Sequence, residues 1–313
     1  MQRYLIRRLL FSLLVIAGVA TLVFSLMHLI PGDPTTAILG MNATPESRAA
    51  LRHDLGLDQP LLMQYVNWWG DLFRGDLGRS VMIGQPVSTL IVQRLPTTIP
   101  LAILAMLFAL LIAIPAGVLS ALRRHSWVDA SASFVAFAGL SIPDFWLGVL
   151  LILGFSLYVR WFPPGGYVSI FQHPLEGLHH LILPAIALGT TFAAALMRMI
   201  RSSLLEVMNR DYVRTARAKG QRESIVVIRH ALRNALIPAV TIMGVQFGTL
   251  LGGTLIIEQV FALPGLGRLT VQAVLDRDFP LVQGCVLVIA TIFVFANLLT
   301  DLLYVYLDPR IKY

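Results

Sequence analysis

The chain is poor in charged residues and has a single cysteine. Of its 313 residues, 13% are Asp, Glu, Lys or Arg, and the one cysteine is Cys285. Soluble domains carry about 25% charged residues. With 57% hydrophobic residues and a mean hydropathy of +0.75, the composition excludes a soluble enzyme, a disordered chain and a repeat solenoid. We therefore expect lipid to be the main solvent of this protein.

The common catalytic and nucleotide-binding motifs are also missing. The sequence contains no Gly-x-x-x-x-Gly-Lys-Ser/Thr phosphate loop, no Gly-x-Ser-x-Gly and no His-Glu-x-x-His. One cysteine excludes an internal disulfide and a multi-cysteine metal site, and its apolar surroundings predict an inert thiol. His179 and His180 follow each other at a span end, where interfacial or capping roles are favoured over metal binding. We expect no enzyme activity, no bound cofactor and no metal site in this chain.

What the sequence has in abundance is long apolar runs. The first is too long for the apolar core of a signal peptide, which is about 7–15 residues, so we expect a retained span. The third run contains Pro143 and Asp144, which predicts a kink or a tilt. Each run reaches the roughly 20 residues that cross the hydrocarbon core. The six expected spans are 9–30, 99–122, 131–159, 180–200, 237–258 and 281–306.

The distribution of positive charge predicts the orientation. Lys and Arg number 24 and Asp and Glu 17, which gives a net charge of +7. A nucleic-acid-binding protein would need a polar basic face, whereas these basic residues lie between apolar runs, so no nucleic-acid partner is expected. If the N-terminus is cytoplasmic, 16 of the 24 basic residues fall in inner segments. The positive-inside rule then makes both termini cytoplasmic.

The connection 31–98 is long enough to contain helices of its own on the outer side. Thr44, Pro45 and Glu46 form a helix start, and Gly56 is a helix stop. Pro60 begins a second helix with an apolar stripe that is suited to the membrane surface. That stripe either packs against the outer ends of the spans or docks a partner. Its members are Leu61, Leu62, Tyr65, Trp68, Trp69, Leu72 and Phe73.

The connection 201–236 lies on the inner side. Its charges recur at helical spacing, with an N-cap at Asp211 and a break at Gly220, so two short helices with an elbow are expected. Nine basic residues fall between Arg198 and Arg233, which is more than topology alone requires. Either these charges only fix the orientation of the chain, or the segment contacts a partner.

Several short motifs occur in order along the chain. In the inner connection they are Tyr212-Val213-Arg214-Thr215-Ala216-Arg217-Ala218-Lys219-Gly220 and His230-Ala231-Leu232-Arg233-Asn234 with Pro238, and elsewhere they are Pro31-Gly32-Asp33-Pro34, Leu55-Gly56-Leu57-Asp58-Gln59-Pro60, Gly75-Asp76-Leu77-Gly78, Pro264-Gly265-Leu266-Gly267-Arg268 and Asp308-Pro309-Arg310. With these motifs the sequence resembles the permeases of bacterial ABC importers, and more narrowly the B-type permease of the dipeptide, oligopeptide and nickel family. The resemblance extends over the whole chain, because the motifs occur at the matching span spacing.

The inner motif departs from the pattern that is general among importers. That pattern reads Glu-Ala-Ala-x-x-x-Gly and then Ile-x-Leu-Pro. Here Arg214-Thr215-Ala216 replaces the acidic start, Gly220 keeps the glycine, and His230-Ala231-Leu232-Arg233 replaces the second part. These departures favour the peptide subfamily over sugar or amino-acid importers.

The resemblance implies an all-α fold, the six-transmembrane-helix type I permease of ABC importers, as a single domain over 1–313. It implies a multi-pass protein of the bacterial inner membrane that passes dipeptides or oligopeptides, with a periplasmic segment 31–98 and a cytoplasmic coupling loop 201–236. The implied partners are a second permease in a heterodimer, two cytoplasmic ATPases that bind ATP and Mg, and a periplasmic or lipid-anchored solute-binding protein. A nickel or glutathione permease of the same family is an alternative, and an ion-coupled secondary transporter is the alternative from another class.

The resemblance also suggests roles for particular residues. The helix in the coupling loop would seat in a cleft on one ATPase, and Gly220 would supply a left-handed elbow. Polar groups at membrane depth turn inward, so Asp144, Gln246 and Glu258 are candidates for the translocation path, with capping of the outer helix end as the alternative for Glu258. Candidates for binding-protein docking are Gln64, Pro264, Gly265, Gly267 and Arg268. The coupling candidates are Asp211, Tyr212, Arg214, Thr215, Ala216, Arg217, Ala218, Lys219 and Gly220.

Overall fold

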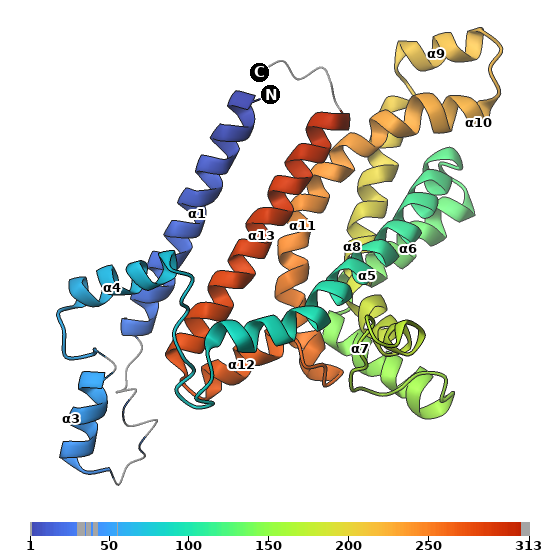
Figure 1. Ribbon diagram of the computed structural model, residues 1–313. Coiled ribbons are helices and arrows are strands. Elements are labelled where there is room, and N and C mark those ends of the chain that lie inside the picture. The colour runs from blue at the N-terminus through green and yellow to red at the C-terminus, as the bar shows by residue number, and fades with distance from the viewer. Residues whose placement is uncertain (1, 30–34, 36–38, 40–42, 55, 308–313) are drawn as a thin grey trace.

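The computed structural model describes residues 2–29, 35, 39, 43–54 and 56–307 and is built from helices (Figure 1). The motif at 31–34, Leu55, and the motif at 308–310 lie outside these residues, as does Ile30 at the end of the first expected span. No strand occurs in the described part, where Arg79 and Pro86 form an isolated bridge. The helices are α1 Gln2–Leu29, α3 Pro45–Asp54, α4 Leu61–Phe73, α5 Val87–Leu122, α6 Trp127–Ser141, α7 Asp144–Leu151, α8 Pro174–Val207, α9 Asp211–Ala218, α10 Glu223–Ile225, α11 Arg233–Val260, α12 Leu266–Leu275 and α13 Phe279–Leu307, with π-helices at Ile152–Tyr158 and Val226–Leu232.

The spans agree with the apolar runs in the sequence. Five helices in the described residues are long and apolar enough to cross a membrane, and a sixth span results if the bent pair α6 and α7 is counted as one. The pair bends by 103°, which is far more than the expected kink. Ile142 has φ −87° and ψ 122°, because a residue before proline is pushed out of the helical region.

The spans alternate in direction, so the molecule has two distinct ends. The start of α1, the end of α13 and helix α9 lie at one end, and α3, α7 and α12 lie at the other (Figure 1). This arrangement agrees with the expected topology, in which both termini share a side with the 201–236 connection. We refer to the α9 end as the inner end and to the α12 end as the outer end.

The core lies where α5, α8 and α11 meet. α5 presents Ala102, Ala105, Ala109 and Ala113, all buried, to α8. A Cβ at Gly189 of α8 would lie 2.5 Å from the Ala105 carbonyl oxygen, so the two backbones are in close approach. Small residues permit such contacts between helices in a membrane, where packing has to replace the hydrophobic effect.

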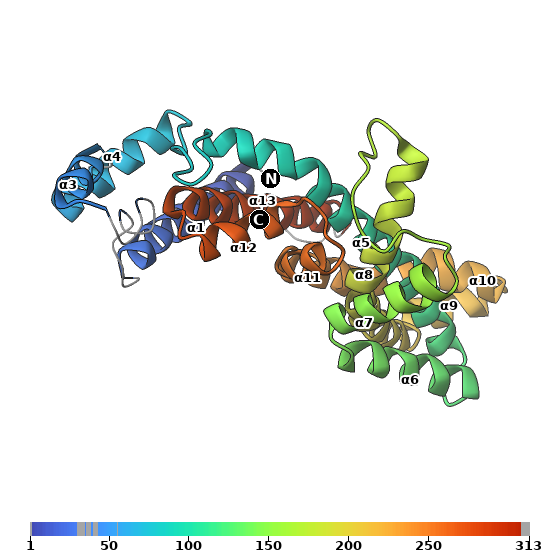
Figure 2. The ribbon, with the colours of Figure 1, turned by 90° about the horizontal axis from the view of Figure 1, so that it is seen from below.

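Helix α1 is peripheral. Seen from below, α1, α3 and α4 lie at one side of an elongated molecule and α6, α7 and α9 at the other (Figure 2). α1 packs on α13. Only 17% of the most apolar 18-residue stretch of α1 is buried, whereas the value for α8 is 67%. The remaining apolar surface of α1 faces outward in this chain.

The helices of the outer connection begin as the sequence predicts. Thr44 Oγ1 accepts a hydrogen bond from the Ser47 amide at 3.2 Å, which caps α3. Gly56 has φ 65°, a conformation in which a side chain costs energy. α4 starts directly after Pro60.

Candidate functional site

The short helix α9, residues Asp211–Ala218, protrudes at the inner end of the molecule. Asp211 lies in its first turn and Arg217 in its last, so both charges complement the helix dipole. Gly220 follows with φ 73°, which is the left-handed elbow that the sequence predicts. Asp211 is the first helical residue and not the N-cap, which is Arg210 and makes no side-chain capping bond. The N-cap expected at Asp211 is therefore wrong by one position.

The second short helix that was expected after the elbow is not a separate element. α10, the π-helix Val226–Leu232 and α11 form one continuous helix from Glu223 to Val260. Apolar residues continue through this stretch, so nothing in it interrupts the helix before the fifth span. The elbow at Gly220 therefore leads directly into a helix that is long and apolar enough to cross the membrane.

Two buried side chains hold α9 against the rest of the inner end. Val213 has no exposed surface and Ala216 is buried, and both pack against Val226 at the start of the π-helix. Val207 and Met208, at the end of α8, complete this contact. The buried stripe ties α9 to both α8 and α11.

Polar contacts add to this attachment. Arg217 donates to Glu223 at 2.6 Å, and this hydrogen bond raises the pKa of Arg217. The Asn234 side-chain amide donates to the Tyr212 hydroxyl at 2.9 Å. The coupling candidates on α9 and in its C-terminal turn are all exposed, with the exception of Ala216. The exposed candidates are Asp211, Tyr212, Arg214, Thr215, Arg217, Ala218, Lys219 and Gly220.

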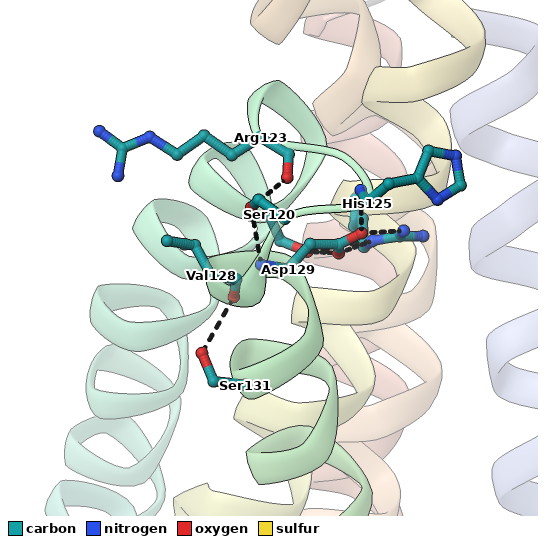
Figure 3. A network of polar contacts seen from close by, with 8 residues as sticks. Ser120, Arg123, His125, Val128, Asp129 and Ser131 are labelled. Atoms are coloured by element: carbon teal, nitrogen blue, oxygen red, sulfur yellow. Dashed lines mark hydrogen bonds and ion pairs between the residues drawn. The ribbon is translucent and has the colours of Figure 1, made fainter.

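A buried ion pair that sequence reasoning missed lies at the same end of the molecule (Figure 3). Asp129 of α6 is 5% exposed and accepts two hydrogen bonds from Arg201 of α8, at 2.7 and 2.8 Å. Ser120 of α5 donates to the same carboxylate, and the His125 amide donates at 3.1 Å. Ser126 caps α6 by accepting from the Asp129 amide, so Ser126 and Asp129 have the spacing of a capping box, a signal present in the sequence. The network joins the inner ends of three spans.

Asp144 lies at the bend between α6 and α7, where it is the first residue of α7. Its carboxylate accepts a hydrogen bond from Thr191 of α8. A Cβ added to Gly253 of α11 would lie 3.7 Å from the other carboxylate oxygen. The bend thus brings one half-buried acid to the junction of α7, α8 and α11. Gln246 is on α11 as well, nearer the inner end, and is also half-buried.

Glu258 has no exposed surface and is fully engaged at the outer end of α11. One carboxylate oxygen accepts from the Thr98 hydroxyl at 2.6 Å, and the other accepts from the Arg268 amide at 2.9 Å. The Thr98 hydroxyl oxygen accepts in turn from the Leu266 amide at 2.8 Å. These contacts differ from the capping alternative, in which Glu258 caps the end of its own helix. The carboxylate instead accepts from the first turn of α12 and holds that helix against α5.

The outer turn 264–268 is more buried than expected for a docking loop. A Cβ at Gly265 would lie 2.1 Å from the Glu258 carboxylate, and one at Gly267 would lie 2.6 Å from the Leu255 Cα. Both glycines are therefore needed for space. Pro264 is half-buried and Arg268 is exposed, so Arg268 is the member of this set that is accessible from outside.

Gln64 is on α4, which packs on the outer part of α1. Tyr65 and Thr21 share a hydrogen bond of 2.7 Å, and the Phe24 ring lies 5.4 Å from the Trp68 ring. The Gln64 side-chain oxygen Oε1 lies 3.1 Å from His28 Nε2. One face of the apolar stripe on α4 thus contacts a span, while Leu61, Leu62 and Phe73 remain exposed.

The described residues contain no cluster of three or more metal-ligating side chains. His179 Nε2 lies 2.6 Å from the Trp161 carbonyl oxygen, and His180 Nδ1 lies 3.2 Å from that of Gly166. Both histidines therefore contact the backbone of the loop that precedes α8.

Comparison with known proteins places this arrangement in a family. The oligopeptide transport system permease protein AppB of Bacillus subtilis is 42% identical over 316 residues, and the dipeptide transport system permease protein DppB of Alkalihalophilus pseudofirmus is 44% identical over 333 residues. Both matches cover 100% of each chain. The fold is similar to a chain of the MetNI methionine ABC transporter, with a TM-score of 0.56, 21% identity and coverage of 70% of this chain and 96% of that one.

Two family descriptions match successive parts of the sequence. Residues 1–102 match the N-terminal region of membrane components of binding-protein-dependent transport systems. Residues 113–313 match the inner membrane component of the same systems. The spans, the inner helix α9 and these matches agree: the chain belongs to the family of binding-protein-dependent transport system inner membrane components, the permease subunits of ABC importers.

Proposed function

We propose that this permease carries dipeptides or oligopeptides across the bacterial inner membrane and forms half of the translocation path. The observation that supports this solute most strongly is the end-to-end match to permeases that are named for oligopeptide and dipeptide transport. Glutathione and nickel complexes are the alternatives within the family. The second permease of a heterodimer would supply the other half of the path.

ATP hydrolysis belongs to other chains in this proposal. The sequence has no phosphate loop, so two cytoplasmic ATPase subunits would bind ATP and Mg. A periplasmic or lipid-anchored binding protein would deliver the solute to the outer end. Membrane lipid surrounds the assembly, and no nucleic acid takes part.

Uptake by the reconstituted transporter tests this function. The assembled complex in proteoliposomes, with its binding protein, should accumulate a radiolabelled dipeptide when ATP is supplied on the ATPase side. A protonophore should leave the rate unchanged, since no ion gradient is used. Excess unlabelled dipeptide should compete, and glutathione or nickel should not. Uptake that stops with the protonophore and persists without ATP would overturn the proposal in favour of an ion-coupled transporter.

We propose α9 as the coupling element between this chain and one ATPase. A helix of 8 residues is about 12 Å long at about 1.5 Å per residue, which is enough to fill a groove on a partner. Its buried stripe holds it to α8 and α11, so a displacement of α9 is transmitted to two spans. Arg214 and Lys219 are exposed on its outer surface and suit acidic groups on the partner.

Cross-linking tests this contact in a Cys285→Ala background. A cysteine at Ala218, exposed on α9, should form a cross-link to an ATPase subunit with a short bifunctional reagent. A cysteine at Leu275, which is 72% exposed at the outer end, is the matched control and should form none. Equal results at both positions would contradict the assignment.

We propose a path lined by the second to fifth spans, in which Asp144 and Gln246 are the polar groups that meet solute or water. Glu258 would face the path only in a transporter state in which its hydrogen bonds with Thr98 and the Arg268 amide are broken. A water-soluble thiol reagent should label Gln246→Cys in at least one nucleotide state in the Cys285→Ala background. Complete protection in every state would remove Gln246 from the path.

We propose that the binding protein docks on the outer connections, over the segment that contains Gln64 and the turn with Pro264, Gly265, Gly267 and Arg268. Within this turn the exposed Arg268 would make the contact, and the two glycines would shape the surface. Cysteines at Gln64 and Arg268 should capture the binding protein. A failure to capture it from either position would count against this surface.

A further inference from the structure

An apolar groove runs along α5, α6 and α8 on the inner half of the spans. Its volume is about 480 Å³, and Phe108, Ala116, Leu119, Val128, Ser131 and Ala132 are among the side chains that line it. Ile112 and Leu119 on one rim, and Val135 on the other, are 47%, 47% and 67% exposed. The groove is therefore open toward the side of the bundle rather than enclosed in the core.

The floor of the groove consists of small residues. Ala132 and Gly139 of α6 and Ala193 of α8 line it. A Cβ on Gly139 would lie 3.3 Å from the Thr190 methyl group, so α6 and α8 are already in contact at this point. The hollow follows from side-chain size and does not arise from separated helices.

A positively charged loop connects the groove-lining residues Leu119 of α5 and Val128 of α6 at the inner end of the groove. Arg123 and Arg124 lie between α5 and α6 and are both exposed, and neither makes a side-chain ion pair in the described part of the chain. Arg123 extends over the same side as Val128, which lines the groove (Figure 3). The acid of this region, Asp129, is buried and already bonded to Arg201. The mouth of the groove therefore presents uncompensated positive charge.

Trp127 adds a second feature of a membrane interface at the mouth. It is the first residue of α6 and is 79% exposed. Tryptophan is enriched at the level of the lipid headgroups. Trp127 directly precedes Val128, which lines the groove. This position indicates that the mouth of the groove lies at headgroup depth, with its apolar part among the acyl chains.

From this juxtaposition we infer that the groove binds one phospholipid of the inner leaflet with an anionic headgroup. An acyl chain lies along Leu119, Val128 and Ala132, and the headgroup phosphate lies at Arg123 and Arg124. Basic residues at the cytoplasmic ends of grooves between spans are suited to anionic headgroups. Charge selects the headgroup, and the apolar groove selects a lipid over a soluble anion.

Native mass spectrometry of the assembled transporter tests the inference, with phosphatidylglycerol and phosphatidylcholine of identical chains as probes. Phosphatidylglycerol should be retained with higher affinity. In the double variant Arg123→Ser and Arg124→Ser, the ratio of the affinities for phosphatidylglycerol and phosphatidylcholine should fall by about tenfold or more. Each basic residue near anionic headgroups raises the affinity about fivefold. Arg222→Ser removes an exposed arginine outside the groove and should leave the preference unchanged.

A second variant separates the groove from the charge. Ala132→Phe fills the apolar part and should reduce retention of both lipids at this site while Arg123 and Arg124 remain. A photoreactive side chain at Ser131 should form adducts with lipid. Equal retention of the two lipids, an unchanged double variant, or a cross-link from Ser131 to the second permease would each overturn the inference, the last by showing that the groove is a subunit interface.

Discussion

The two ends of the long helix Glu223–Val260 are each joined to a glycine turn, but the turns require glycine for different reasons. At the inner elbow, Gly220 has φ 73°, and a Cβ there would meet no other atom within 4 Å. At the outer turn, Gly265 has φ −98°, and its Cβ would lie 2.1 Å from the Glu258 carboxylate. The inner turn depends on a backbone angle, whereas the outer turn depends on space.

The two turns also differ in burial. The inner elbow is exposed and carries ion pairs such as Arg217 with Glu223, whose net contributions to stability are small. The outer turn is packed around a buried carboxylate that also binds Thr98 of α5. The outer turn is therefore a packed part of the fold, whereas the inner elbow is an exposed turn, as the proposed contact with an ATPase requires.

The largest effect is expected from Gly265→Ala. Its methyl group would occupy the position of the Glu258 carboxylate, and overpacking of this kind costs about 1–3 kcal/mol, to which a displaced buried carboxylate adds. The purified complex should unfold at a clearly lower temperature in size-exclusion assays after heating. Gly252→Ala is the control, because its Cβ would meet nothing within 4 Å. Equal stability of the two variants would contradict the role of space at this turn.

A smaller and local effect is expected from Val213→Asn. Val213 has no exposed surface and is the main apolar anchor of α9, so a polar group there should detach the helix without unfolding the spans. Hydrogen–deuterium exchange should rise by about tenfold or more in 211–218, which corresponds to about 1.4 kcal/mol of lost local stability. Thr215→Asn, on the exposed side of the same helix, should leave the exchange unchanged. A uniform rise across the whole protein would mean that Val213 supports the global fold instead.

The smallest effect is expected at the Arg217–Glu223 pair. Reversal of Arg217 alone places two acids together, and the swap Arg217→Glu with Glu223→Arg restores opposite charges. The effect of the single reversal should be small, because an exposed ion pair contributes about 0.2–1 kcal/mol to stability. If the pair only positions α9, the swap should restore the transport rate that the single reversal lowers. If Arg217 instead meets an acid on the ATPase, the swap should remain impaired. Uptake rates of the two variants distinguish these roles.

The sequence predicted the parts of the fold that depend on long regular patterns. The apolar runs located the spans of the described residues. Gly220 located the elbow, because a glycine just after a helix is typical of a left-handed C-terminal turn. The sharp bend at Pro143 was anticipated only as a kink, because its angle depends on how α7 packs on α8 and α11. The fusion of the second inner helix with α11 was missed, because a few charges among apolar residues do not end a helix.

The candidate sites were harder to predict where function depends on tertiary contacts. Asp129 and Arg201 are 72 residues apart, and only the packing of α6 on α8 brings them together. Glu258 looked equally suited to a water-filled path and to a helix cap. Its contacts with Thr98 and Arg268 involve partners that no local pattern connects to it.

We propose that α9 and its elbow couple ATP hydrolysis on the ATPase to transport by this chain. The most direct measurement is dipeptide-stimulated ATP hydrolysis by the reconstituted complex containing Gly220→Val or Gly220→Asn. Asparagine tolerates the left-handed conformation, whereas a β-branched residue does not, and neither meets a steric obstacle at the Cβ. We predict that both variants insert and assemble normally, that Gly220→Asn keeps most of the stimulated hydrolysis, and that Gly220→Val loses it. Full stimulation in the assembled Gly220→Val complex would exclude coupling through this elbow.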